Sequence, residues 1–286
     1  MRFKRRYRSK YVQDQRAASP AGGGLSRIPI GGLAGGGIGG VIILLLVLFM
    51  SGGLFGGDEG APGGSGDSAI PRGADPEADL VSFVSFVFDD AQATWSEEFQ
   101  ALGESYRPAR MVLYREAIDS GCGFATSEVG PFYCPADEKV YLDLGFFEEL
   151  QQRYGAQGDF AQAYVIAHEV GHHVQTLLGI SDRVQRLSGR DPAEANELSI
   201  QQELQADCLA GVWGQGTRER GLLESGDVQE GLGAAAAVGD DRIQKEATGE
   251  VDPDTWTHGS SEQRQTWFQN GLRTGSFEAC DTFGWS

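Results

Sequence analysis

The feature that most restricts this chain is a charge-free apolar run from Ile28 to Met50. The run is about long enough for a helix to cross the ~30 Å hydrocarbon core of a bilayer, and transmembrane helices tolerate the glycines of its first half. Residues 1–27 before it carry eight Lys or Arg and one Asp. Because basic flanks tend to stay in the cytoplasm, we expect a single-pass membrane protein with 1–27 as a cytoplasmic basic tail and 28–50 as an uncleaved transmembrane helix. Everything after the helix is then extracytoplasmic.

Two other interpretations of this run are open. A cleaved signal peptide is disfavoured because the charged region is long and no small-x-small cleavage site follows. A buried core helix is disfavoured because the run lies directly beside the basic residues. Residues 51–74 are rich in Gly, Ser and Pro and are expected to form a flexible linker, which leaves 75–286 as the folded extracytoplasmic domain.

The charge of the chain restricts its partners. The formal net charge is −18, and beyond residue 27 there are 40 acidic residues against 15 basic ones. Phosphate recognition needs a cationic surface, so nucleic acid is not an expected partner. The lipid bilayer, contacted through the N-terminal helix, is an expected partner.

The four cysteines, Cys122, Cys134, Cys208 and Cys280, form an even set. In an oxidising compartment such a set favours two disulfides, although four cysteines allow three pairings and four buried thiols are the alternative. The short, turn-rich stretch between Cys122 and Cys134 favours a local bridge, which would leave Cys208 for Cys280. A zinc site made of the four cysteines is disfavoured because no CxxC pair exists.

Periodicity predicts an α+β domain that is mostly helical. A helix is expected from Pro76, because Leu80, Val84, Val87, Ala91 and Trp95 recur at helical spacing. Runs of branched and aromatic residues predict two short strands. The expected strands are 109–116 and 139–144, and the further expected helices are 146–154, 159–178, 191–213, 228–247 and 261–273. The small sheet therefore precedes the helix at 159–178.

That helix carries the sequence "HEVGH". His168 and His172 are four residues apart, so both side chains leave one face of the helix and can meet one Zn²⁺. Glu169 follows the first histidine and is directed toward a water molecule at the metal, the position of a general base. Gly171 in a helix interior costs about 1 kcal/mol relative to alanine, so a packing or access reason is expected for it.

A catalytic zinc site needs a third protein ligand. No histidine follows at the spacing of the HExxHxxGxxH pattern, so the candidates are carboxylates of the next helix, namely Glu194, Glu197 and Glu203. Only Glu203 has an acid four residues later, at Asp207, so this pair shares a helical face beside small alanines. We expect Glu203 to bind the metal and Asp207 to accept a hydrogen bond from a ligand histidine.

HExxH followed by ExxxD on a later helix resembles the gluzincin group of zinc peptidases. The stretches "GPFYCPADEKVYLDL", "AYVIAHEVGHHVQ", "ELQADCLAGVW" and "AVGDDRIQ" resemble the bacterial putative neutral zinc metallopeptidase family. The resemblance implies a zincin-like metallopeptidase domain, an N-terminal membrane segment, a Zn²⁺ cofactor and a protein or peptide substrate. The expected activity is that of a hydrolase.

The expected mechanism uses Glu169 as the base that activates water at zinc. The 139–144 strand could offer its edge to an extended substrate. His258 is expected to donate a hydrogen bond to the transition state, since "WTHGSSEQRQ" is similar to a His-x5-Arg segment of prenyl-protease-type zinc peptidases. Arg264 is expected to orient His258 or to pair with Asp240 or Asp241.

One more histidine has an expected role, and two alternatives for the zinc site are open. His173 lies about 100° around the helix from its ligand neighbour and is expected to be a packed or solvated histidine. The zinc site could also belong to an inert binding or scaffold protein, or to an amidase that acts on non-peptide substrates.

Overall fold

The computed structural model of the protein describes residues 1–17, 75–189 and 192–285. The predicted transmembrane helix at 28–50 and the predicted linker at 51–74 lie outside these residues. Within the described ranges, no helix combines the length and the apolar character that a membrane span requires.

A four-stranded sheet runs in the order β1-β2-β6-β5. Its first three strands are parallel, and β5 is antiparallel to β6. A separate hairpin pairs β3 with β4. The bounds are β1 Val12–Asp14, β2 Arg110–Tyr114, β3 Ala117–Ser120, β4 Gly123–Thr126, β5 Phe132–Cys134 and β6 Lys139–Asp143. Strands β2 and β6 confirm the two predicted strands, whereas the other four are too short to give an apolar pattern of their own.

Helices make up most of the described chain, which confirms the α+β, mostly helical fold class. Their bounds are α2 Ala78–Ala101, α3 Gly145–Gln152, α4 Asp159–Leu177, α5 Ile180–Ser188, α6 Pro192–Glu219, α7 Asp227–Ala237, α8 Asp240–Thr248 and α9 Ser261–Thr274. Short 3-10 turns lie at Ser127–Val129, Pro253–Thr255 and Glu278–Cys280.

Two features of these helices differ from the prediction. A further helix, α5, begins at Ile180, directly after the predicted helix ends, in a stretch where no helix was predicted. The helix predicted at 228–247 is two helices, α7 and α8, that separate at Gly239. A side chain at Gly239 would bring its Cβ to 2.4 Å from the backbone nitrogen of Ser261, so the close approach of α9 requires glycine there.

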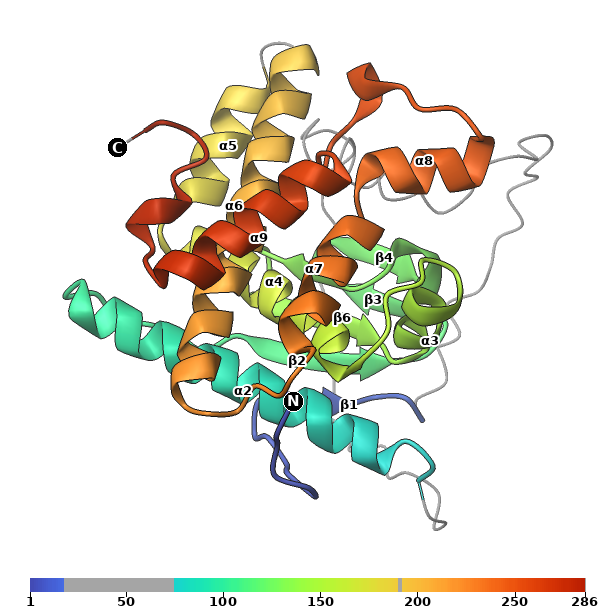
Figure 1. Ribbon diagram of the computed structural model, residues 1–286, viewed down its shortest axis with the longest axis vertical. Helices are drawn as coiled ribbons and strands as arrows, with labels where there is room; N and C mark the ends of the chain where they lie inside the picture. The colour runs from blue at the N-terminus through green and yellow to red at the C-terminus, as the bar shows by residue number, and fades with distance from the viewer. Residues whose placement is uncertain (18–74, 190–191, 286) are drawn as a thin grey trace, which may run out of the picture.

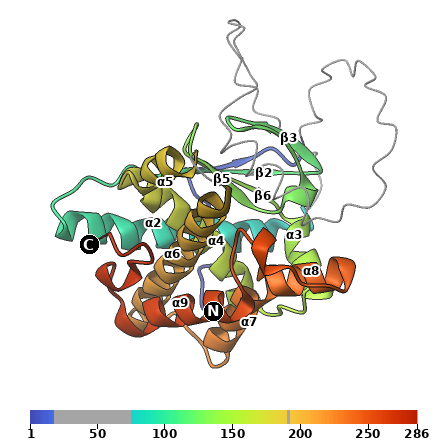
Figure 2. The same cartoon turned by 90° about the horizontal axis from the view of Figure 1, so that it is seen from above.

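Helix α4 occupies the centre of the domain (Figure 1). It contacts α2, α6, α7 and the edge strand β5, and α6 in turn packs along α9. Viewed from above, the sheet lies on one side of the domain and α7 and α9 on the other (Figure 2). The core between them includes the fully buried Trp95 of α2 and a stack of Phe160 on Trp213, whose ring centroids are 5.6 Å apart.

The N-terminal residues 1–17 belong to this domain. Strand β1 pairs with β2, and the ring of Phe3 packs edge-on against Phe83 of α2 with centroids 5.1 Å apart. The guanidinium of Arg16 forms an ion pair with Asp75 at 2.7 Å, on the far side of the undescribed segment 18–74. The prediction of a basic tail separate from the domain therefore differs from the structure over residues 1–17.

Both predicted disulfides are confirmed. Cys122 bonds to Cys134 with the Cα atoms 5.8 Å apart, and this bridge ties the β3–β4 hairpin to β5. Cys208 bonds to Cys280 with the Cα atoms 5.5 Å apart, and this bridge ties the end of the chain to α6. No free cysteine lies among the residues that the structure describes.

Candidate metal centre

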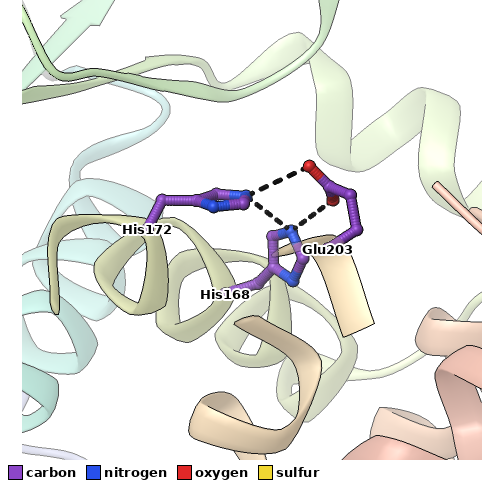
Figure 3. A group of neighbouring side chains, drawn as sticks. All are labelled: His168, His172 and Glu203. Carbon is purple, nitrogen blue, oxygen red and sulfur yellow. Dashed lines mark hydrogen bonds and ion pairs between the residues drawn. The ribbon is translucent and has the colours of Figure 1, made fainter. Parts of the chain in front are cut away.

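Three side chains from two helices converge between α4 and α6 (Figure 3). His168 and His172 project from one face of α4, as their spacing predicts, and their Nε2 atoms lie 3.1 Å apart. Glu203 of α6 approaches both rings, with one carboxylate oxygen 3.1 Å from His168 Nε2 and the other 3.4 Å from His172 Nε2. The structure therefore brings together the three predicted ligands, whereas Glu194 and Glu197 lie at the exposed start of α6.

The donor set fits a zinc ion. In a tetrahedron with zinc-to-ligand bonds of 2.0–2.1 Å, neighbouring donor atoms are about 3.3–3.4 Å apart, close to the separations of these atoms. Two imidazoles and one carboxylate are also the nitrogen and oxygen ligands that zinc accepts in catalytic sites. Three protein ligands leave one position for a water molecule or a substrate.

The outer nitrogen of each ligand ring has its own partner. Nδ1 of His168 lies 2.9 Å from Asp207, and Nδ1 of His172 lies 2.9 Å from the side-chain oxygen of Gln175. Because a carboxylate and an amide oxygen only accept hydrogen bonds, each Nδ1 carries a proton, so each Nε2 can present a lone pair to a metal ion that takes the place of any proton there. Asp207 thus occupies its predicted place, while Gln175 was missed.

Arg264 lies behind the centre, in a different place from the predicted one. Its guanidinium donates to both carboxylate oxygens of Asp207 at 2.8 and 2.9 Å, rather than pairing with Asp240 or Asp241. Asp207 also accepts a hydrogen bond from the hydroxyl of Tyr164. Asp207 and Arg264 are 0% and 3% exposed, so they form a buried ion pair that supports the ring of His168.

Small residues allow the helices to approach this closely. A Cβ built at Gly171 would lie 3.1 Å from the backbone oxygen of Ala206, which supplies the packing reason expected for that glycine. A Cβ at Gly271 would lie 1.9 Å from the backbone oxygen of Cys208. Backbone contact between α4 and α6, and between α6 and α9, carries Glu203, Asp207 and Arg264 to the histidines.

Charges around His168 determine its protonation in the metal-free protein. Burial disfavours the charged ring, yet the charge of Asp207 and the hydrogen bonds of Asp207 and Glu203 raise the pKa of His168 to about 10. Burial also opposes ionisation of Glu203, but His172 and His168 hold the pKa of its carboxyl well below the usual range. A bound cation would take the place of the proton that these groups share.

Glu169 is buried beside the two ligand histidines. Burial raises the pKa of its carboxyl, although the nearby charges of His172 and His168 and a hydrogen bond from the backbone of Tyr133 counteract this rise. A carboxyl with a raised pKa suits proton transfer near neutral pH. The location of Glu169 next to the metal ligands agrees with the predicted general base.

The contact with Tyr133 places strand β5 next to the centre. Among the strands that the structure describes, β5 pairs only with β6, so it is an edge of the sheet, whereas β6 lies between β2 and β5. The prediction that 139–144 offers an edge to a substrate is therefore wrong, because both sides of β6 are already paired. The free edge near the centre belongs to β5.

His173 is fully buried and faces away from the other two rings, as expected of a packed histidine. Its Nε2 donates to the backbone oxygen of Arg107 at 2.6 Å, and its Nδ1 accepts from the hydroxyl of Tyr133 at 3.0 Å. Burial lowers the pKa of His173, which keeps the ring neutral. Its role here is to hold β5 against α4.

His258 lies in the loop before α9, on the α8–α9 side of the centre, close enough to Glu203 for their charges to interact. Asp240, the first residue of α8, accepts from the backbone nitrogens of residues 257–259 at 2.8, 2.7 and 3.1 Å and lies 3.1 Å from His258 Nδ1. Burial lowers the pKa of His258, but Asp240 and Glu203 together raise it. The contact between Asp240 and His258 was not predicted from the sequence. Asp240 holds this loop in place and leaves Nε2 of the ring available for another hydrogen bond.

A second group of carboxylates consists of Asp159, Asp227 and Glu230. The ammonium of Met1 forms ion pairs with Asp159 at 2.7 Å and with Asp227 at 3.3 Å. The ammonium of Met1 therefore already pairs with two of these three carboxylates.

A small sheet before a helix that carries two histidines at metal-ligand spacing, with a carboxylate from a later helix, defines a zincin-like α+β domain. The family model described as "Putative neutral zinc metallopeptidase" matches residues 1–283. The chain belongs to this family.

Two bacterial relatives show how far the likeness extends. "Uncharacterized protein YpfJ" of Escherichia coli strain K12 is 44% identical over 99% of this chain and 99% of its own length. "Uncharacterized protein Rv2575" of Mycobacterium tuberculosis strain H37Rv is 43% identical over 76% of this chain and 75% of its own length. No solved structure matches the chain.

Proposed function

We propose that this protein is a membrane-attached zinc peptidase. The observation that carries the proposal is the convergence of His168, His172 and Glu203 at zinc-ligand spacing, with the buried Glu169 beside them. Family membership supports a hydrolase of this kind. The apolar run at 28–50 supports attachment to a membrane, and the two disulfides support an oxidising compartment.

Each residue of the centre has a distinct task in this proposal. His168, His172 and Glu203 hold the zinc ion, which supplies Lewis acidity when bound. Glu169 accepts the proton of the attacking water molecule and then delivers it to the nitrogen of the leaving amine. Burial raises the pKa of Glu169, which strengthens this carboxylate as a proton acceptor.

The two sides of the centre supply substrate contacts. The free backbone edge of β5 pairs with an extended peptide and holds the scissile carbonyl over the centre. His258 donates a hydrogen bond from Nε2 to the oxygen that becomes negative in the transition state, while Asp240 holds its Nδ1. This arrangement favours peptides over compact non-peptide amides, because an extended backbone can use the edge strand.

Replacement of Glu169 by Gln tests the proposal on the full chain. We expect Glu169→Gln to retain zinc and to lose peptide cleavage by about 10²–10⁴-fold, because the amide cannot accept the proton. Zinc content and cleavage of a peptide library would be measured for both proteins. Glu197→Gln, at an exposed position on α6, is the matched control and should behave like the wild type.

The outcomes separate the alternatives. A wild-type protein that binds one zinc ion and cleaves neither peptides nor other amides would be an inert zinc-binding protein. Cleavage of non-peptide amides alone would identify an amidase. Cleavage that persists in Glu169→Gln would remove the proposed base from the mechanism.

A further inference from the structure

The N-terminal segment is fixed to the domain by the spaced side chains of Phe3, Tyr7 and Ser9. Phe3 packs on Phe83, the ring of Tyr7 packs edge-on against Phe86 at 5.6 Å, and the hydroxyl of Tyr7 donates to Asp89 at 2.9 Å. These contacts attach residues 3–9 along the outer side of α2, the blue segment below that helix in Figure 1. The segment is therefore a built surface of the protein.

The residues between these anchors are cationic and point outward. The exposed residues are Lys4, Arg5, Arg6, Arg8 and Lys10. Apart from the ammonium of Lys10 over the ring of Tyr11, at 4.9 Å, their side chains make no hydrogen bond or ion pair with any described residue. Five unpaired cations within seven positions stand out on a chain whose formal net charge is −18.

The end of the N-terminal segment, at residue 16, is bound to residues 75–77 of the domain. Arg16, whose side chain is only 7% exposed, binds the carboxylates of Asp75 and Glu77 at 2.7 and 2.8 Å. Beside it, Val12 pairs with Met111 in the β1–β2 register. A chain held together at residues 16 and 75 has both ends of the intervening segment on one side of any membrane, which differs from the predicted single-pass topology.

We propose that the face formed by residues 4–10 rests on an anionic lipid surface, on the same side of the membrane as the metal centre. Charge complementarity supports this partner, because the phosphates of lipid headgroups can accept hydrogen bonds from all five side chains and form ion pairs with them. This inference rests on the proposed membrane attachment through the apolar run that begins at Ile28, which would hold this face near a bilayer. The cations would thus orient the acidic domain on the membrane that the chain is attached to.

The size of the effect follows from the number of cations that reach the headgroups. A Lys or Arg near an anionic surface contributes about 1 kcal/mol, which is roughly a fivefold gain in binding for each side chain. Two engaged side chains already predict a gain on the order of 30-fold over a neutral surface, and the gain should shrink at high salt.

Flotation of the full chain with vesicles tests the lipid contact. One set of vesicles contains phosphatidylcholine alone, and in the other part of it is replaced by phosphatidylglycerol. We expect the wild type to prefer the anionic vesicles, and the variant Lys4→Gln/Arg5→Gln/Arg6→Gln/Arg8→Gln/Lys10→Gln to lose that preference while it still binds both. Five exposed cations of other faces provide the matched control, which should keep the preference: Arg110→Gln/Arg186→Gln/Arg218→Gln/Lys245→Gln/Arg273→Gln.

Labelling of the full chain in intact cells tests whether the N-terminal face and the rest of the domain lie on the same side of the membrane. Lys4→Cys and Ser96→Cys introduce exposed thiols on the N-terminal face and on α2, and a membrane-impermeant maleimide should label both or neither. Labelling of one position alone would overturn the proposal, as would an equal preference for anionic vesicles in the wild type and the N-terminal variant. Neither readout depends on catalysis, so failure here is distinguishable from failure of the proposed peptidase activity.

Discussion

The two sides of the metal centre are built in different ways. On the α4–α6 side, ligands lie at helical spacing, and Asp207 and Gln175 hold the two rings by their outer nitrogens. On the α8–α9 side, His258 lies in a loop and depends on one carboxylate, Asp240, for its placement. The candidate metal ligands therefore lie on the paired helices, and His258, the proposed hydrogen-bond donor to the transition state, lies on a separate element. Binding and assistance should therefore be separable by mutation.

The largest effect is expected from the loss of a ligand. His172→Gln removes one of three donors, so zinc should be lost and cleavage should fall by more than the ~10²–10³-fold expected for loss of a single transition-state donor. Zinc content after dialysis and peptide cleavage would be measured together. His173→Gln is the matched control, because the adjacent ring faces away; it should lose stability and keep its zinc. Retention of zinc in His172→Gln would contradict the assignment.

A smaller effect is expected on the other side of the centre. His258→Gln should lower kcat by about 10²–10³-fold, because the transition state loses a hydrogen bond that the ground state does not use. Zinc content should stay at the wild-type level. Loss of zinc would mean that the two sides are not separable, and a change in KM alone would mean that His258 only binds substrate.

Sequence periodicity predicted the α4–α6 side because both of its patterns are local. Two histidines four residues apart on a helix must share a face, and so must Glu203 and Asp207. The central helices followed from the same spacing, and α4 spans Asp159–Leu177 against a prediction of 159–178. Helical spacing alone therefore points to the three residues that the structure brings together, His168, His172 and Glu203.

The other side was predicted only in part, because its contacts are long-range. Alanines before Gly239 gave no sign that the helix would break, yet this break places Asp240 at the start of α8, under His258. Arg264 was expected near Asp240 but pairs with Asp207, which comes within reach only because α6 and α9 touch at Gly271. The edge strand β5 has three residues, too few for a periodic signal.

Two carboxylates, Asp207 and Asp240, provide a further test of whether the two sides of the centre are separable. Asp207→Asn should weaken zinc binding by about 10–100-fold, because the ring of His168 loses the acceptor that directs it. Asp240→Asn should leave zinc affinity unchanged and lower kcat by less than the loss of His258 itself. Competition with a chelator would give the affinities. Equal losses of zinc affinity in the two variants would show that the centre acts as one unit.

The smallest effect concerns the pH dependence of the metal-free domain. The pKa of His168 is about 10 in the folded protein, above its ordinary value of 6.5, so the folded state binds this proton more tightly than the unfolded chain. This contribution to stability is fully present below pH 6.5 and is lost as pH rises through about 10. The unfolding midpoint of the chelator-treated protein should fall over that window, by about 2–4 °C for each kcal/mol lost.

Two controls decide whether His168 is responsible for that fall. His168→Gln removes the titrating ring and should flatten the midpoint between pH 6.5 and 10. The zinc-loaded wild type should also lack the fall, because zinc binds the ring without this proton, so none is released as pH rises. A midpoint that falls equally in the metal-free wild type and the variant would assign the pH dependence to other groups. His168 would then be a zinc ligand whose proton contributes nothing to the fold.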